Sequence, residues 1–162
     1  MKTMIQVWDR YSQEPPLKQL TRLMEVDMTK SYPSVLSHAR RKITFRDHTA
    51  NDLTSSIIAF FNLQGGFAER INNMGQQLDR KGERIWVKGN GKDGTADISA
   101  TFNGISVKVE VKAGNDRQSD AQKEYQRRIE AAGGIYIIAR NFDGFIYEFF
   151  RRIDQKGNER VK

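Results

Sequence analysis

Polar and apolar residues alternate along two neighbouring segments of the chain, 97–102 and 105–112. This period-two alternation is typical of β-strands that bury one face. Asn103-Gly104 lies between the segments and favours a two-residue type I′ turn, because both turn residues adopt positive φ. A two-residue turn fixes the pairing of the strands. Phe102 faces Ile105, and successive pairs back from the turn place Asp97 directly opposite Glu110.

The polar side chains of this predicted hairpin share one face. They are Asp97, Ser99, Thr101, Ser106, Lys108, Glu110 and Lys112. Directly opposed carboxylates repel each other and destabilise a sheet. A hard divalent cation between them relieves the repulsion and takes their oxygens as ligands, while Lys112 on the same face can hold a phosphate or a water. The alternative is an ordinary solvated face, on which these residues are only surface charge.

Apolar residues elsewhere follow helical or strand spacing and predict further elements on both sides of the hairpin. We expect helices over 17–27 and 34–42, a helix that follows the capping residues 49–52 and ends at Gly65, and a helix that starts after Ser119. We expect strands over 67–72, 84–88, 135–139 and 145–150, polar loops over 75–81 and 88–94, and a frayed basic tail over 151–162.

The segment after Lys112 predicts how the sheet continues. Ser119 and Gln122 have the spacing of a capping box, and Gly133 suits the end of the helix that this box starts. The continuous apolar run 135–139 is typical of a strand buried on both faces. Strand, helix and strand in this order predict a parallel partner for the Glu110 strand. The chain is therefore expected to form an α/β domain with a mixed central sheet flanked by helices.

Composition and charge narrow the classes of function. The chain has 162 residues, of which 38% are hydrophobic, and this suits one domain with a single core. Its formal net charge of +7 favours a polyanionic partner such as a nucleic acid. Cysteine is absent, which excludes disulfides and thiolate metal sites. The sequence shows neither a membrane-spanning run nor a signal stretch, so we expect no membrane partner and a cytoplasmic location.

Basic residues form candidate contacts to nucleic-acid backbone. They are Arg40, Arg41, Lys42, Arg70, Lys88 and Lys92. Lysine and arginine clusters neutralise phosphates without reading base sequence. The alternative for the 40–42 cluster is a solvated face, and Arg70 equally suits a packing or turn-forming role.

The order of the polar residues matches a nuclease superfamily. Asp97, then Glu110-Val111-Lys112 on the next strand, then Gln122-Lys123-Glu124-Tyr125 in a helix, resemble the PD-(D/E)xK nucleases. Within that superfamily the chain most resembles the virus-type replication-repair nuclease (VRR-NUC) family. The likeness runs from about Leu53 to Ile138 and includes the segments 68–75 and 131–138. The family usually has Pro before the first Asp, where this chain has Ala96, but that Pro does no chemistry.

The resemblance implies a restriction-endonuclease-like core over 49–150. It leaves residues 1–48 as a partly helical extension that contacts DNA or forms a dimer arm, and 151–162 as a basic tail. It implies a metal-dependent nuclease that hydrolyses DNA phosphodiester bonds, prefers branched or four-way-junction (Holliday junction) DNA, and works as a homodimer of bacterial or phage origin. The alternatives are a non-catalytic nucleic-acid-binding module on the same fold and a nuclease that acts on RNA.

The resemblance also implies roles for individual residues. Mg²⁺ or Mn²⁺ would be held by Asp97, Glu110 and the backbone carbonyl of Val111. Lys112 would orient or deprotonate the attacking water, or stabilise the charge that develops on the phosphate. Gln122 would contact the water or the phosphate, with helix capping as an alternative or additional role. The family places an extra carboxylate near the start of the first helix, where Asp52 is available; its alternative is to favour the helix dipole.

Overall fold

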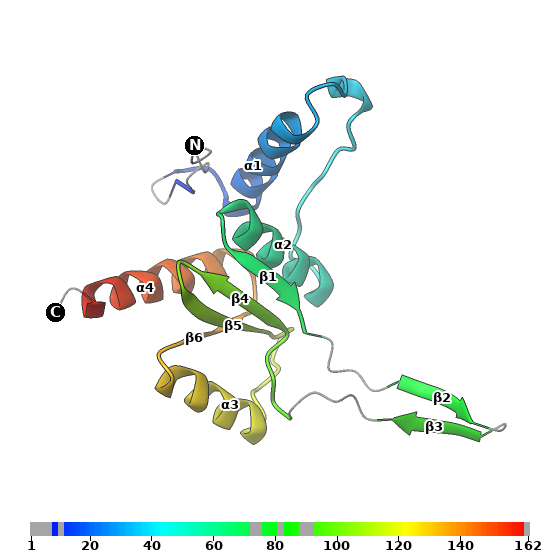
Figure 1. Cartoon of the computed structure of the whole chain (residues 1–162), viewed down its shortest axis with the longest axis vertical. Helices are drawn as coiled ribbons and strands as arrows, with labels where there is room; N and C mark the ends of the chain where they lie inside the picture. Colours follow the sequence, from blue (N-terminus) through cyan, green and yellow to red (C-terminus); the bar gives the residue numbers. More distant parts are fainter. Residues whose placement is uncertain (1–7, 10–11, 72–75, 81–82, 88–92, 161–162) are drawn as a thin grey trace.

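A four-stranded mixed sheet forms the centre of the protein in the computed structural model (Figure 1), which describes the chain except for residues 1–7, 10–11, 72–75, 81–82, 88–92 and 161–162. The strand order is β1-β4-β5-β6, in which β1 (Phe67–Arg70), β4 (Ile98–Phe102) and β5 (Ile105–Val111) are antiparallel neighbours. β6 (Ile135–Ala139) pairs with β5 in parallel. The predicted mixed α/β sheet is therefore confirmed.

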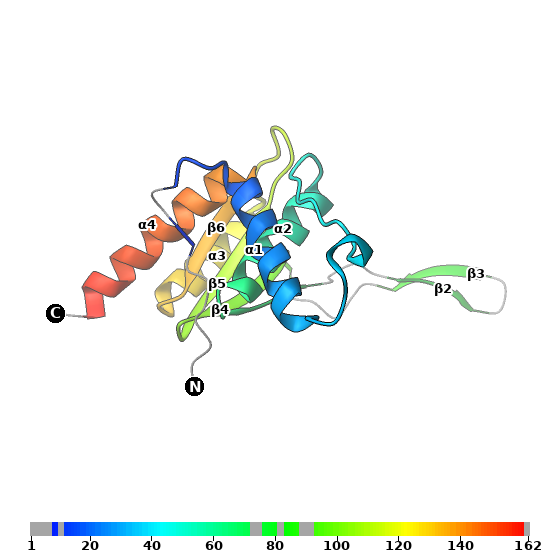
Figure 2. The ribbon, with the colours of Figure 1, turned by 90° about the horizontal axis from the view of Figure 1, so that it is seen from above.

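Helices cover both faces of this sheet. α1 (Pro16–Ser31), α2 (Ala50–Leu63) and α4 (Phe142–Arg160) contact one another, and α2 and α4 contact the strands on the apolar face of the hairpin. α3 (Asp120–Ala131) connects β5 to β6 and packs against β6 on the opposite, polar face. A separate ribbon of β2 (Gln76–Arg80) and β3 (Glu83–Val87) projects away from this body in both views (Figures 1 and 2).

The hairpin has the predicted register. Phe102 pairs with Ile105 and Ile98 pairs with Val109, so continuing by one residue places Asp97 beside Glu110. The turn residues Asn103 and Gly104 have φ of 48° and 75°, as a type I′ turn requires. The apolar residues of both strands are buried, apart from the partly buried Phe102 and Val111, whereas the polar face is more accessible except at Glu110.

The core on the apolar face is rich in phenylalanine. Rings from α2 and α4 meet edge-to-face, for example Phe60 and Phe149 with centroids 5.3 Å apart. Part of the predicted N-terminal extension belongs to the same core, because Trp8 and Leu20 are buried in one cluster with Phe60. α1 thus supports the helices that hold the sheet.

The strand predicted over 145–150 is wrong, because this segment lies inside α4. Asn141 starts the helix by accepting a 2.7 Å hydrogen bond at Oδ1 from the Gly144 N–H, and Asp47 Oδ2 accepts one of 2.9 Å from the Phe142 N–H. Phe142, Phe145 and Phe149 then form the buried face of the helix. The predicted frayed tail is also wrong over 151–160, and the boundary placed after residue 150 falls within α4.

Two further predictions differ from the structure. β2 occupies part of the segment expected as a polar loop over 75–81, where pairing with β3 outweighs the polar composition. The helix expected over 34–42 is only a 3₁₀ turn, η1 (Ser37–Ala39). The other predicted helices are present, and α1 extends beyond 17–27. None of the described helices is long and apolar enough to span a bilayer.

Candidate active site

Asp97 immediately precedes β4 and is fixed by its backbone and its side chain. Its carbonyl accepts a 2.8 Å hydrogen bond from the Ile71 N–H, which extends the pairing of β1 with β4. Its carboxylate Oδ2 accepts a 2.8 Å hydrogen bond from the Val111 N–H. This second bond crosses from β4 to β5 and holds the Asp97 carboxylate at the end of β5 that carries Glu110. The hairpin pattern predicts the proximity of Asp97 and Glu110 but not this bond.

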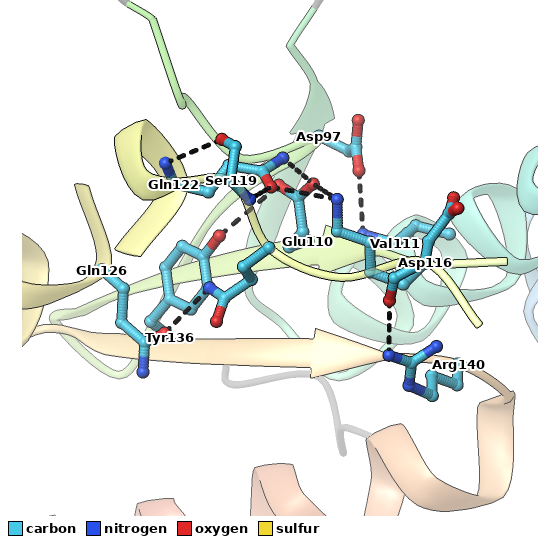
Figure 3. Close-up of polar contacts among 11 residues, drawn as sticks. Asp97, Glu110, Val111, Asp116, Ser119, Gln122, Gln126, Tyr136 and Arg140 are labelled. Atoms are coloured by element: carbon cyan, nitrogen blue, oxygen red, sulfur yellow. Dashed lines mark hydrogen bonds and ion pairs between the residues drawn. The ribbon is translucent and has the colours of Figure 1, made fainter. Parts of the chain in front are cut away.

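Glu110 is the centre of the site, and its side chain is surrounded by donors (Figure 3). Only 3% of the residue is exposed. Lys112 Nζ lies 3.1 Å from Glu110 Oε1, and Gln122 Nε2 donates a hydrogen bond to the same oxygen. The Tyr136 hydroxyl lies 3.5 Å from Oε2. A carboxylate with this many donors is held in one orientation, although it is almost out of contact with solvent.

The electrostatic environment of Glu110 opposes its negative charge. Burial is the largest cause that raises the pKa of Glu110, and the nearby charge of Asp97 raises it further. The hydrogen bonds and charge of Lys112, together with the Tyr136 hydrogen bond, lower the pKa but do not reverse the shift. An added positive charge beside the two carboxylates would therefore favour the ionised form of Glu110.

Lys112 is positioned from both its backbone and its ammonium group. Its N–H donates a 2.9 Å hydrogen bond to the Ala139 carbonyl, which continues the pairing of β5 with β6. Its Nζ donates a 3.0 Å hydrogen bond to Gln122 Oε1 in addition to the contact with Glu110. With its side chain only 12% exposed, Lys112 is a partly desolvated cation directed at the Glu110 carboxylate.

Gln122 caps α3, as the sequence suggested, and its side chain also contacts two other residues of the site, whereas its contact with a water or a phosphate remains a prediction. Its backbone N–H donates to Ser119 Oγ at 3.3 Å, and its Oε1 accepts from the Ser119 N–H at 2.9 Å, so the capping box is present. The same side chain contacts Glu110 and Lys112. The cap thus fixes the amide that orients the site.

Two close contacts hold α3 and its leading loop against the strands. Gly94, with φ of +80°, lies so near the first turn of α3 that an added Cβ would stand 2.3 Å from the backbone of Ala121. Arg140 donates to the carbonyls of Gly114 and Asp116, the latter at 2.7 Å. These contacts locate the start of α3, and with it Gln122, relative to β5.

Asp52 makes its hydrogen bonds to Thr49, with which it forms the capping box of α2. Its neighbour Asn51 accepts a 3.0 Å hydrogen bond from Arg70 Nη1, so the start of α2 lies near the end of β1. Within the described ranges, no group of three or more Asp, Glu, His or Cys side chains is placed to hold a metal ion. The suggested metal role of Asp52 therefore remains a prediction.

The basic candidates are distributed over separate regions. Arg40, Arg41 and Lys42 line one side of a cleft of about 460 Å³ that faces α1. Arg40 hydrogen-bonds to the Thr29 hydroxyl and the Tyr32 carbonyl, which gives it a structural role as well. Arg41 and Lys42 are exposed. Lys88 and Lys92 lie outside the described residues.

Sequence reasoning missed Tyr136, which contacts Glu110 from β6. The available signal was a hydroxyl group in an otherwise apolar strand, Ile135–Ala139, because a buried hydroxyl requires a polar partner. The site therefore comprises Asp97, Glu110, Lys112, Gln122 and Tyr136. Comparisons with protein-family models, curated proteins and solved structures found no match to this chain.

Proposed function

We propose that this protein is a divalent-metal-dependent nuclease that hydrolyses phosphodiester bonds in DNA. The observation that carries the proposal is the buried carboxylate of Glu110, placed next to Asp97 and 3.1 Å from the ammonium group of Lys112. A polar core of this kind costs stability, because burial and like charges both disfavour it. Its presence in a sheet of otherwise conventional pattern supports a chemical role.

The donor set suits a small hard cation. Asp97 and Glu110 supply carboxylate oxygens, and the Val111 carbonyl is the third ligand that the family resemblance suggests. Mg²⁺ is commonly bound through one or two carboxylates, with water and substrate phosphate at its remaining positions, so a third acidic side chain is not required. The raised pKa of Glu110 also supports a cation at this position, because a nearby positive charge would favour the ionised carboxylate. Mn²⁺ suits the same oxygen ligands.

When bound, the cation would supply Lewis-acid polarisation of the phosphate and an activated water. The residues of the protein would bind the cation and orient the phosphate and the groups around it. Gln122 holds the Glu110 carboxylate in place, and the Val111 N–H holds the Asp97 carboxylate, so that the oxygens of both are ready to bind the cation. Once a cation compensates Glu110, the Lys112 ammonium can instead donate to a phosphate oxygen and stabilise its developing charge. Gln122 Oε1 keeps that ammonium directed into the site.

The finer parts of the proposal rest on the family resemblance. They are a restriction-endonuclease-like core, a preference for branched or four-way-junction DNA, and a homodimer with two active sites. The mixed sheet with helices on both faces is compatible with such a core. The net charge of +7 favours a nucleic-acid substrate, and the exposed Arg41 and Lys42 are candidate phosphate contacts.

The test is a cleavage assay on a panel of labelled substrates: linear, flapped and four-way-junction DNA, and RNA of the same sequence. Each is incubated with Mg²⁺, Mn²⁺ or EDTA. We expect cleavage of DNA with either metal, no cleavage with EDTA, and faster cleavage of branched substrates. Light scattering should show a dimer. Cleavage of RNA alone would change the substrate class, and binding without cleavage under all metal conditions would contradict the nuclease proposal.

A further inference from the structure

Tyr136 lies between the candidate site and partly buried polar residues at α3. It is 1% exposed and is the one residue of β6 with a polar side chain. Its hydroxyl donates to Glu110 Oε2 at 3.5 Å, near the outer limit for a hydrogen bond. Figure 3 shows Tyr136 directed at Glu110 from the side opposite Asp97. Neither the hairpin pattern nor the proposed chemistry assigns this residue a role.

The position of the Tyr136 ring is fixed from α3. The ring of Tyr125 packs against it edge-to-face, with centroids 6.2 Å apart and an interplanar angle of 67°. The Gln118 amide lies beside the Tyr136 hydroxyl. Gln118 Nε2 also donates to Gln126 Oε1 at 2.9 Å. Tyr136 therefore has little freedom to turn away from Glu110.

The two oxygens of Glu110 have different surroundings. Oε1 contacts both Lys112 and Gln122, whereas the hydrogen bond described for Oε2 is that from Tyr136. Two donors on one oxygen hold its position but still allow the carboxylate plane to rotate about it. A donor on the second oxygen fixes the plane. The Tyr136 hydroxyl is placed to act as this donor.

We propose that Tyr136 is a positioning residue that fixes the carboxylate plane of Glu110 for binding a divalent cation. This inference rests on the proposed function, because it requires that Glu110 is a metal ligand. Partners that orient a ligand side chain typically contribute about 10- to 100-fold to metal affinity. Since the Tyr136 contact is long, its contribution should lie near the lower value.

The test compares Mn²⁺ affinities of the whole chain, measured by electron paramagnetic resonance, in the wild type, Tyr136→Phe and Tyr125→Phe. Tyr136→Phe keeps the ring and removes the donor, and should weaken Mn²⁺ binding by about 10-fold. Tyr125→Phe makes the same chemical change on the neighbouring ring and should leave the affinity unchanged. High Mn²⁺ concentration should restore cleavage by Tyr136→Phe, because the substitution affects affinity rather than the reacting groups.

The outcomes separate this inference from the proposed function. The metal site itself would be overturned if the wild-type protein bound no Mn²⁺. It would also be overturned if Glu110→Gln bound Mn²⁺ as tightly as the wild type. Binding that depends on Glu110 but is equal in Tyr136→Phe and wild type would overturn the role of Tyr136. Gln118→Ala provides a second test if Tyr136→Phe does not fold, because it leaves the tyrosine and removes the amide that lies beside its hydroxyl. Unchanged affinity in that variant would likewise overturn the inference.

Discussion

Asp97→Asn removes one negative charge from the site while keeping the shape of the side chain. Its amide oxygen can still accept the hydrogen bond from the Val111 N–H. Because the charge of Asp97 raises the pKa of Glu110, second only to burial, the substitution should bring that pKa nearer to its ordinary value. The metal-free protein should therefore become more stable, whereas its stabilisation by Mn²⁺ should be lost.

The size of this effect follows from the spacing of the hairpin. The Cβ atoms of directly opposed residues lie about 5 Å apart. Two unit charges at that distance repel by about 0.8 kcal/mol in water or about 3 kcal/mol at an effective dielectric constant of about 20. Lys112 offsets part of the repulsion, and Asp97 is only half-buried. We therefore expect a gain of about 1 kcal/mol, or a rise in Tm of about 2–4 °C for a chain of this size.

The stabilisation should depend on pH in a defined direction. The folded-state pKa of Glu110 lies above its ordinary value of 4.5. Between these two values the folded protein binds more protons than the unfolded chain, so the free energy of unfolding decreases as the pH rises through this window. Below pH 4.5 Glu110 is protonated in both states, so the cost of burying its charge is absent. Asp97→Asn should make the decrease smaller, and so its advantage over the wild type should grow with pH.

Calorimetric melts in EDTA and in Mn²⁺, between pH 4 and 8, measure these quantities. Asp27→Asn is the matched control, because Asp27 is an exposed residue on α1. An unchanged or lower Tm for Asp97→Asn in EDTA would refute the repulsion between the carboxylates. Equal Mn²⁺-induced shifts in the variant and the wild type would show that Asp97 is not a ligand.

Further substitutions test the placement of the site and its nucleic-acid contacts. Gly94→Ala should displace the first turn of α3, because its Cβ would stand 2.3 Å from the Ala121 backbone, and should weaken Mn²⁺ binding. Gly104→Ala is the control, because Gly104 also has a positive φ but an added Cβ there would meet nothing within 4 Å. It should lose only about 1–2 kcal/mol of stability and keep its Mn²⁺ affinity. Equal Mn²⁺ affinities in Gly94→Ala and Gly104→Ala would contradict this placement of α3. Arg41→Ala and Lys42→Ala should each reduce the slope of log K against log[salt] for DNA binding by about 0.9. An unchanged slope in titrations at several salt concentrations would remove them from the interface.

The hairpin and the crossover could be predicted because local signals determine them. The Asn103-Gly104 turn sets the pairing of β4 with β5, and the alternation of the two strands then decides which side chains share a face. The capping box at Ser119 marked the start of α3, and the buried run that follows marked β6. These predictions required no knowledge of distant contacts.

Other features depend on contacts between distant parts of the chain. The segment 145–150 resembles a short apolar strand, and its helical state is evident only with the Asn141 cap and the Asp47 contact, which comes from 95 residues away. The bond from Val111 to Asp97 depends on the exact direction of a side chain at the edge of β4. Tyr136 lies 26 residues from Glu110, and only the parallel pairing of β5 with β6 brings them together.

The most direct measurement of the central claim is single-turnover DNA cleavage by the wild type and Glu110→Gln in Mg²⁺. The variant keeps the size of the buried side chain but removes the charged ligand. Both proteins should show the same circular dichroism and bind DNA equally, and Glu148→Gln on α4 serves as the matched control. We predict that Glu110→Gln lowers the cleavage rate by more than about 100-fold, the largest loss usual for an outer partner of a metal site, while the control cleaves normally. Cleavage by purified Glu110→Gln at the wild-type rate would contradict the assignment of this site.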